Sequence, residues 1–406
     1  MKKGAKIAVG VAVGVVGVLA IAVGTVYGIW SKEINSVLSI KEIVPPHEEN
    51  QAGAVYEMTM DGGYYFDDFL AKGGAKSDDE LIDFIVDSLT KGLFEVDLGS
   101  PDVGCSSFAV TDENGNNLFG RNYDFSSTSS LILHTNPGNG RHASISSVDL
   151  QFLDLSDGIH GIVDSLTAIA AAYAPLDGMN DAGVSCGIYM SYQGPDGGTV
   201  ATDQNTELPD LTSTTMLRLI LDYADNVDEA VELVKRYDFH DSANSSFHYM
   251  VADASGKSAI LEWVTPGATD LTDLDGSKRE LKVYYNDDDA SLGANEAAEN
   301  FQYVTNFIVT PDYYETEEAK KGLDRYEYIH DFINGDGTNN AGIVSRDDCM
   351  TLLEDLGRRK WKTTHAGQSD NITVWSVLYD LDNLTATWVS NEEFGVEGST
   401  FNFSLR

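Results

Sequence analysis

The sequence has few basic residues and few cysteines, and both shortages exclude classes of protein. Only 26 lysines and arginines stand against 65 aspartates and glutamates, so the formal net charge is −39. A nucleic-acid-binding protein needs a basic surface for the phosphates, so that class is excluded. The three cysteines, Cys105, Cys186 and Cys349, are too few and too scattered for a disulfide framework or a zinc cluster.

Metal-binding spacing and internal repeats are also lacking. The eight histidines show no H-E-x-x-H or similar arrangement, so we predict no metal and no cofactor. The content of apolar residues is 42% and that of aromatic residues 10%, which is normal for a globular core and excludes a disordered chain. A length of 406 residues allows two or three domains, or one large domain with additions.

Residues 1–30 have the pattern of a membrane anchor. An uncharged, largely apolar run from Ile7 to Trp30 follows three lysines in the first six positions. About 20 apolar residues cross a bilayer, and the lysines place the N-terminal end in the cytoplasm. Because the run has no clear small-residue cleavage site, we predict a cytoplasmic tip with an uncleaved transmembrane signal anchor. A cleaved signal peptide is the alternative, and either one places the rest of the chain outside the cytoplasm.

Residues 31–104 are predicted to form a stalk and a compact region before the first cysteine. The patterning over 31–60 is weak and a Pro45-Pro46 pair interrupts it, which indicates a stalk. Ser77 and Glu80 have the spacing of a capping box, so a helix is expected from there to about Leu93. A turn-like segment then leads to Gly104 and Cys105.

Two stretches, Gly104–Val110 and Gly120–Phe125, predict a β-hairpin around the turn-rich tip Asp112–Asn116. Cys105 begins one strand, while Arg121 and Asp124 lie on or just beyond the other, so their side chains would come within reach of one another. A cysteine attacks as a thiolate and needs neighbouring groups that hold and polarise it. Taken separately, a buried cysteine is more often a core residue, and an Arg/Asp pair is usually a structural ion pair.

The combined pattern of G-C-S-S-F, a hairpin and G-R-N-Y-D-F resembles the start of the mature chain in the choloylglycine hydrolase and penicillin V acylase family. Acid ceramidase and N-acylethanolamine acid amidase are more distant relatives, and all are N-terminal nucleophile (Ntn) hydrolases. The resemblance implies a four-layer αββα sandwich, whereas periodicity alone gives only the α+β class. It also implies that residues 105–406 are the catalytic domain and that the preceding segment is a pro-region.

In an Ntn hydrolase the first residue supplies both the attacking atom and the base. An α-amine has a pKa of about 7.7–8.0, so part of it is neutral near pH 7 and can accept the thiol proton. In an intact chain the nitrogen of Cys105 is an amide and cannot do so. Gly104 leaves its carbonyl open to the thiol, and the resemblance implies autoproteolysis at the Gly104–Cys105 bond.

The resemblance assigns roles to four further residues. Asp124 would accept a hydrogen bond from the α-amino group of Cys105, and Arg121 would lie beside the thiol. Asn306 would donate to the oxyanion, a contact whose loss costs about 3–4 kcal/mol of transition-state stabilisation. Arg325 would complete the charge network. Without the resemblance, Asn306 would be a polar strand end and Arg325 a charge on a helix surface.

A second oxyanion donor is expected on the strand after the turn D-G-M-N-D-A-G-V, which resembles the family's N-E-K-G-L turn. Counting from Asn180 places that donor at Met190, which has no suitable group. Tyr189, one residue earlier, is the remaining candidate, and a core tyrosine is the alternative.

The rest of the chain alternates strands and helices. We predict helices within 212–236, strand pairs over 246–263 and 372–390, and an acidic surface excursion over 269–289. Cys186 and Cys349 are interpreted as structural residues.

The function predicted from the sequence is hydrolysis of a linear, non-peptide amide through a thioester on Cys105. N-acyl amino acids, conjugated bile salts, N-acylethanolamines and penicillin V all fit the family. An acyltransferase with the same thioester chemistry is one alternative, and an uncleaved, non-catalytic, membrane-anchored surface module is another. Because residues 1–104 carry the predicted anchor, we expect that the two fragments stay packed together after a cut before Cys105, or that the processing is controlled.

Overall fold

The computed structural model describes residues 30–47, 52–90, 104–193, 198–267, 274–287, 301–334, 343–365 and 371–405. The predicted membrane anchor lies outside these residues except for its last position. No helix in the described part of the chain combines the length and apolar character that crossing a membrane requires.

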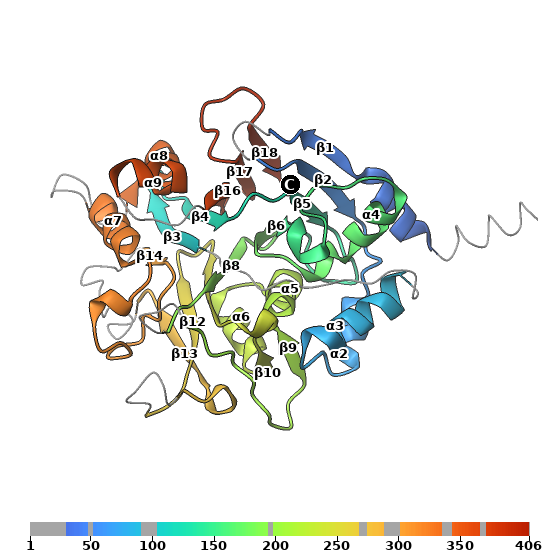
Figure 1. Cartoon of the computed structure of the whole chain (residues 1–406), viewed down its shortest axis with the longest axis horizontal. Coiled ribbons are helices and arrows are strands. Elements are labelled where there is room, and N and C mark those ends of the chain that lie inside the picture. Colours follow the sequence, from blue (N-terminus) through green and yellow to red (C-terminus); the bar gives the residue numbers. More distant parts are fainter. Residues whose placement is uncertain are drawn as a thin grey trace, which may run out of the picture.

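Two β-sheets form the centre of the molecule (Figure 1). The larger has nine strands in the order β1-β2-β5-β6-β7-β8-β11-β12-β13. These are β1 (Lys41–Val44), β2 (Val55–Met60), β5 (Ser130–Thr135), β6 (Ser144–Asp149), β7 (Asp177–Asn180), β8 (Val184–Met190), β11 (Phe247–Asp253), β12 (Ser258–Val264) and β13 (Glu280–Tyr285). Two further short strands, β9 (Asp210–Thr212) and β10 (Asp238–His240), pair with each other in parallel.

The smaller sheet has seven strands, six of them in the order β14-β3-β4-β16-β17-β18, with β15 also paired to β3. These are β3 (Gly104–Asp112), β4 (Asn117–Phe125), β14 (Phe301–Val304), β15 (Ile343–Val344), β16 (Ile372–Asp380), β17 (Thr385–Ser390) and β18 (Thr400–Ser404).

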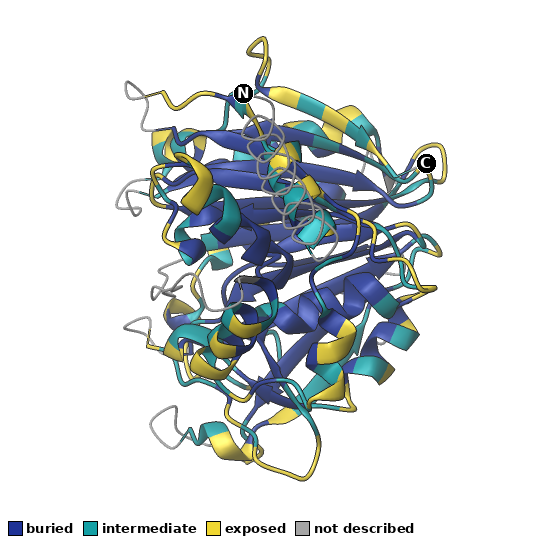
Figure 2. Cartoon of the chain, turned by 90° about the vertical axis from the view of Figure 1, so that its right-hand side faces the viewer, coloured by how far each residue is buried: buried dark blue, intermediate teal, exposed yellow. Residues whose placement is uncertain are grey.

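The two sheets pack face to face. The Tyr189 hydroxyl on β8 donates to Ser107 Oγ on β3 across 2.7 Å, and Arg121 on β4 pairs with Asp177 on β7 across 3.0 Å. The inner strands are buried on both faces, as Figure 2 shows, and β8, β11 and β16 are buried along their whole length. These strands are mostly apolar and do not alternate strictly between apolar and polar residues, as expected for strands that are buried on both faces.

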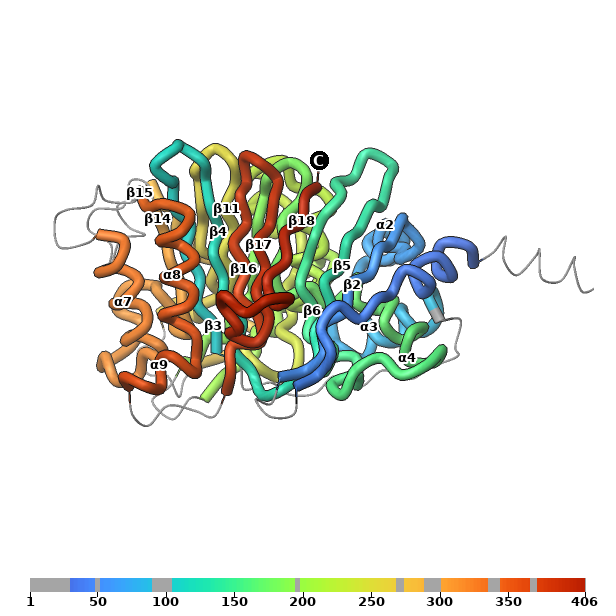
Figure 3. Tube along the Cα trace, turned by 90° about the horizontal axis from the view of Figure 1, so that it is seen from above, coloured from blue at the N-terminus to red at the C-terminus, as the bar shows by residue number. Residues whose placement is uncertain are grey.

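Helices cover the outer faces of both sheets (Figures 1 and 3). On the smaller sheet lie α7 (Leu323–Asn334), α8 (Arg346–Leu356) and α9 (Arg358–Thr364). On the larger lie α5 (Ser213–Tyr223) and α6 (Val227–Val234). Asn122 of β4 donates to the Leu353 carbonyl of α8, and Arg218 of α5 donates to Ser144 at the start of β6. The order is therefore helix, sheet, sheet, helix, and the predicted mixed α+β sandwich is confirmed.

Local helix signals in the sequence are confirmed. Ser77 accepts a hydrogen bond from the Glu80 backbone N–H and caps α3 (Asp78–Ile85). Asn226 caps α6 in the same way through the backbone N–H of Glu229. Two shorter helices are α2 (Phe66–Ala71) and α4 (Ile162–Thr167).

The predicted stalk over residues 31–60 is wrong for the described part of that segment. Residues 30–39 are helical, and β1 and β2 belong to the nine-stranded sheet. Strand β2 pairs in parallel with β5 from Val55↔Ser130 to Met60↔Thr135. Residue 104 therefore marks the predicted cut but does not separate two folding units.

The predicted surface excursion over 269–289 is also wrong where the structure describes it. Strand β13 extends the larger sheet antiparallel to β12. Its side chains are only partly buried because it is an edge strand, and Glu280 and Lys282 are the kind of charged residues that protect such an edge. Because of these charged residues, the sequence did not indicate a strand here.

Candidate active site

The predicted hairpin is confirmed, and its register decides which side chains meet. Strands β3 and β4 pair antiparallel, with Cys105 opposite Tyr123 and Ser107 opposite Arg121. Directly paired residues share a face of a sheet. Since Ser107 accepts the hydrogen bond from Tyr189 of the larger sheet, these four side chains all point between the sheets.

Arg121 lies beside the candidate nucleophile. Its Nη2 is 3.5 Å from Cys105 Sγ, and its Nε is 3.0 Å from Asp177 Oδ2. The ring of Tyr189 packs against the guanidinium, with 4.5 Å between the ring centre and Cζ. All these groups are fully buried, so the cation is held in one place by a carboxylate and an aromatic face.

Burial nevertheless keeps the thiol protonated in the intact chain. It raises the pKa of the Cys105 thiol to about 11, although Arg121 acts in the opposite direction. A thiol with such a pKa carries little thiolate at neutral pH. The intact chain therefore holds its nucleophile in a weakly reactive form.

The backbone nitrogen of Cys105 is bound by Asn306, two residues beyond the end of β14. This N–H donates to Asn306 Oδ1 across 2.9 Å, while Asn306 Nδ2 donates to the Met190 carbonyl across 2.9 Å. The structure thus brings Asn306 to Cys105 from 201 positions away. Its role as an oxyanion donor stays a prediction, because Nδ2 is occupied by Met190 in the intact chain.

Arg325 joins the predicted residues into one network. Its Nη2 donates to the Cys105 carbonyl at 3.2 Å and to Asn306 Oδ1 at 3.1 Å, and its Nη1 pairs with Asp124. Asp124 also accepts from Thr373 Oγ1 across 2.6 Å. All five predicted residues are therefore brought together, but Asp124 is tied to Arg325 and Thr373 rather than to the nitrogen of Cys105.

The position of Asp124 follows from strand geometry. Arg121 and Asp124 are three residues apart on β4, so they lie on opposite faces of the sheet. Asp124 lies instead against Gly104, where an added Cβ would come within 3.0 Å of Asp124 Oδ2. Its predicted contact with the α-amine of Cys105 concerns the cut chain and stays a prediction.

Tyr189, the predicted second oxyanion donor, supports Arg121 in the intact chain. Its hydroxyl already donates to Ser107, and its ring lies against the guanidinium. Met190, the position reached by counting from Asn180, contributes its backbone carbonyl to Asn306.

Sequence reasoning missed a buried pair that holds the segment carrying Asn306. His248 Nε2 lies 2.9 Å from the Thr305 carbonyl and its Nδ1 lies 3.1 Å from Glu262 Oε1. Glu262 also accepts hydrogen bonds from the backbone N–H groups of Val309 (2.7 Å) and Thr310 (3.0 Å). The only signal was a glutamate within the apolar strand S-A-I-L-E-W-V.

Sequence reasoning also missed the carboxylate partner of Arg121. Besides this pairing, Asp177 accepts hydrogen bonds from Trp375 Nε1 at 2.9 Å and from the Tyr379 hydroxyl at 2.7 Å. Asp177 lies on β7, so the D-G-M-N part of the predicted turn is a strand and the turn itself is confined to residues 181–183. The partners of Asp177 come from distant strands, so the local pattern gave it no role.

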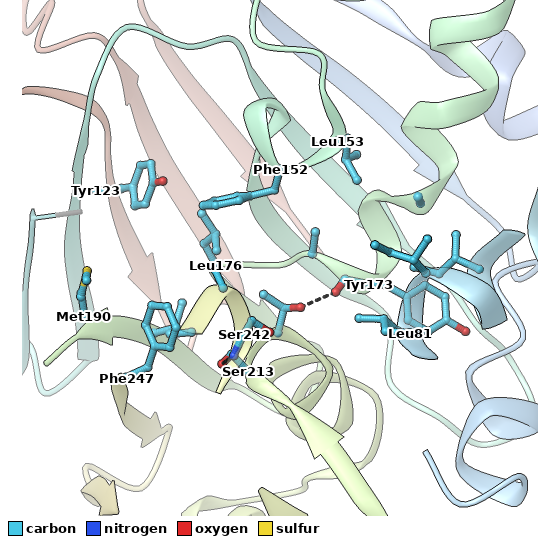
Figure 4. A pocket seen from close by; sticks show the side chains of 17 residues that line it. Leu81, Tyr123, Phe152, Leu153, Tyr173, Leu176, Met190, Ser213, Ser242 and Phe247 are labelled. Carbon is cyan, nitrogen blue, oxygen red and sulfur yellow. Dashed lines mark hydrogen bonds between the residues drawn. The ribbon is translucent and has the colours of Figure 1, made fainter. Parts of the chain in front are cut away.

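An apolar cavity begins next to this network (Figure 4). Its empty volume is about 790 Å³ when the part that is open to solvent is included. Tyr123, the cross-strand partner of Cys105, and Met190, whose carbonyl binds Asn306, both line it. Among the described residues that line it, none is charged.

Cys186 and Cys349 are buried and unpaired, as expected for structural cysteines. Within the described part of the chain there is no group of three or more His, Cys, Asp or Glu side chains placed to hold a metal ion.

The family model described as linear amide C-N hydrolases, choloylglycine hydrolase family, matches residues 105–271. The resemblance to this family is confirmed. The match begins at Cys105, the residue predicted to become the new N-terminus. No curated protein matches the chain.

Solved structures similar to this chain include a mutant conjugated bile acid hydrolase from Clostridium perfringens, with 14% identity and a TM-score of 0.46 over 74% of this chain and 92% of that one. Penicillin V acylase from Agrobacterium tumefaciens has 15% identity and a TM-score of 0.40 over 74% and 86% of the two chains.

Proposed function

We propose that this protein hydrolyses linear, non-peptide amides through Cys105, after autoproteolysis of the Gly104–Cys105 bond. One observation carries the proposal: the thiol lies beside Arg121 while Asn306 holds the nitrogen of the same residue and Arg325 its carbonyl. The start of the family match at Cys105 supports the position of the cut.

In the cleavage step, Cys105 Sγ attacks the carbonyl carbon of Gly104. A C–S bond forms, the C–N bond breaks, and the thiol proton passes to the departing nitrogen, which becomes the α-amine. Water then hydrolyses the thioester, which leaves a carboxylate on Gly104 and a free thiol on Cys105. The absence of a side chain at Gly104 suits this step, because even a Cβ would crowd Asp124.

In turnover, the new α-amine takes the thiol proton and Cys105 attacks the substrate carbonyl. Departure of residue 104 would uncover Asp124, which could then bind the α-ammonium group. Asn306 Nδ2 would stabilise the oxyanion once it leaves Met190, and Arg121 favours the thiolate. The ammonium proton passes to the leaving amine, and water hydrolyses the acyl thioester to the free acid.

The apolar cavity beside Tyr123 and Met190 supports a substrate with an apolar acyl group. The amine half is small or an amino acid, as in N-acyl amino acids, conjugated bile salts, N-acylethanolamines or penicillin V. Anchoring in the membrane with the catalytic part outside the cytoplasm belongs to the same proposal and rests on the sequence of residues 1–30.

Incubating the purified full chain with these four substrate classes, while measuring the free amine, tests the proposal. The wild type and a Cys186→Ala control should release amine, whereas a Cys105→Ala variant should release none. Added hydroxylamine separates the chemical alternatives, since an acyltransferase would form mainly the hydroxamate even at low acceptor concentration. A wild type that stays whole and cleaves none of the four would instead be the non-catalytic module.

A further inference from the structure

The apolar cavity has two ends that belong to different parts of the chain. Figure 4 shows Tyr123 and Met190 on one side of the cavity and Leu81 on the opposite side. The first side adjoins the Cys105 network, as described above. The far side is formed by Leu81, Ile82 and Ile85, which all lie on α3. Helix α3 therefore closes the end that an acyl chain extending from Cys105 would reach last.

Helix α3 precedes the proposed cut, yet it is fixed to the other walls of the cavity. Asp78 Oδ2, at its first turn, accepts the backbone N–H of Ala243 across 2.7 Å, and Ala243 itself lines the cavity. Leu81 and Ile85 are 3% and 4% exposed. The helix is thus packed as part of the cavity wall.

The segment that carries α3 is also held in the sheet. Val55, Met58 and Met60 of β2 are fully buried, and β2 pairs with β5 along all six of its residues. The Tyr64 hydroxyl lies 3.0 and 3.1 Å from the two carboxylate oxygens of Asp222 on α5. Breaking one peptide bond at residue 104 removes none of these contacts. We therefore expect the segment not to dissociate.

The aromatic residues of α2 attach the same segment to the cavity lining. The rings of Phe66 and Phe69 pack on Tyr173 with centre-to-centre distances of 5.8 and 5.7 Å. Tyr173 lines the cavity, and its hydroxyl donates to the Tyr64 carbonyl across 2.6 Å. Losing the N-terminal segment would therefore open the cavity and remove its far wall.

We propose that Leu81, Ile82 and Ile85 of α3, in the segment that is expected to stay bound after the cut, set the length of acyl chain that the site accepts. The substrate class is an amide whose acyl group is a long, uncharged hydrocarbon chain. This inference rests on the proposed hydrolysis at Cys105 and adds the specificity wall to it.

Substitutions on α3 test the inference through the acyl-length profile of amide hydrolysis. Ile82→Trp fills the far end, so kcat/KM for a palmitoyl amide should fall about tenfold or more while that for the octanoyl amide changes little. Leu81→Ala lengthens the cavity and should move the optimum towards longer chains. Asp83→Trp, on the exposed face of the same helix, is the matched control and should leave the profile unchanged.

A photoreactive fatty acid gives a readout that does not depend on catalysis. With the full-length protein, we expect labelling of the peptide that contains α3, competed by unlabelled palmitate and reduced by Ile82→Trp but not by Asp83→Trp. Size-exclusion chromatography of the cut protein should show both fragments eluting together. Labelling without any amide hydrolysis would keep the α3 site and refute the proposed activity.

The inference is overturned if the acyl-length profile is the same in the wild type and both cavity variants while hydrolysis proceeds. It is equally overturned if the N-terminal fragment separates under native conditions and the Cys105 fragment keeps its profile. In either case the proposed hydrolysis would stand.

Discussion

Cys105 and Cys186 lie on strands of the two facing sheets, and both side chains are almost completely buried. Burial raises the pKa of both thiols, to about 11 at Cys105 and well above the ordinary value at Cys186. Cys105 points between the sheets towards Arg121. Cys186 alternates with Gly187, whose Cβ position faces Arg121, so it points towards the helices on the other side.

The comparison shows that neither burial nor the raised pKa distinguishes a nucleophile here. What distinguishes Cys105 is that Arg121 contacts its thiol, Asn306 its nitrogen and Arg325 its carbonyl. Such contacts are expected at a residue whose side chain attacks the preceding peptide bond. Variants that remove one of these contacts, or the groups that position it, test this difference between the two cysteines.

The largest effect is expected from Asn306→Ala. It removes the acceptor for the Cys105 nitrogen and the predicted oxyanion donor, so hydrolysis should slow about 10²–10³-fold. Asn383→Ala, at the exposed turn between β16 and β17, is the control and should keep full activity. Comparable rates in both variants would remove Asn306 from the catalytic set. Thermal unfolding checks that the variant still folds.

A double variant, Arg121→Gln with Asp177→Asn, should leave the Cys105 thiol without a contacting cation, as is the case for Cys186. Replacing both partners avoids leaving a buried carboxylate unpaired. Loss of a neighbouring cation should raise the pKa of the Cys105 thiol by about 1–3 units. A raised pKa keeps the thiol protonated to higher pH, so alkylation by iodoacetamide should be slower at each pH below it.

The measurement for this double variant is the pH profile of alkylation, mapped to each cysteine. Mass analysis separates the intact chain from cut fragments in one sample. Identical profiles for the wild type and the double variant would show that Arg121 does not tune the thiol.

A smaller effect is expected from Glu262→Gln. It weakens the support of His248 and of the backbone near Val309, so Asn306 should lose its fixed position. We expect kcat to fall about tenfold, with KM little changed, because misplacement affects the transition state most. Glu57→Gln breaks a partly exposed His–Glu pair between β2 and β5 and is the control for loss of such a pair outside the site. A change confined to thermal stability would mean that the pair has only a structural role.

Local signals allowed the hairpin and the helices to be predicted. The turn between β3 and β4 and the caps at Ser77 and Asn226 depend on residues close in sequence. The face occupied by Asp124 could also have been predicted, since an odd spacing from Arg121 on a strand places the two side chains on opposite faces.

Long-range contacts could not be predicted from the residues alone. Strand β2 was interpreted as part of a stalk because its partner β5 lies 75 residues later and pairs in parallel, which leaves no local turn signal between them. Asn306 and Arg325 entered the candidate site only through the family resemblance. His248 and Glu262 were missed because the pattern of β11 and β12 shows burial but not what a buried charge contacts.

Intact-mass analysis with N-terminal sequencing tests the central claim most directly. It should be made on the wild type, Cys105→Ala and Cys186→Ala after incubation under mildly acidic, neutral and reducing conditions. We predict that the wild type and Cys186→Ala give a fragment beginning at Cys105 while Cys105→Ala stays whole. A wild type that stays whole under all these conditions, or a fragment beginning at another residue, would contradict the account.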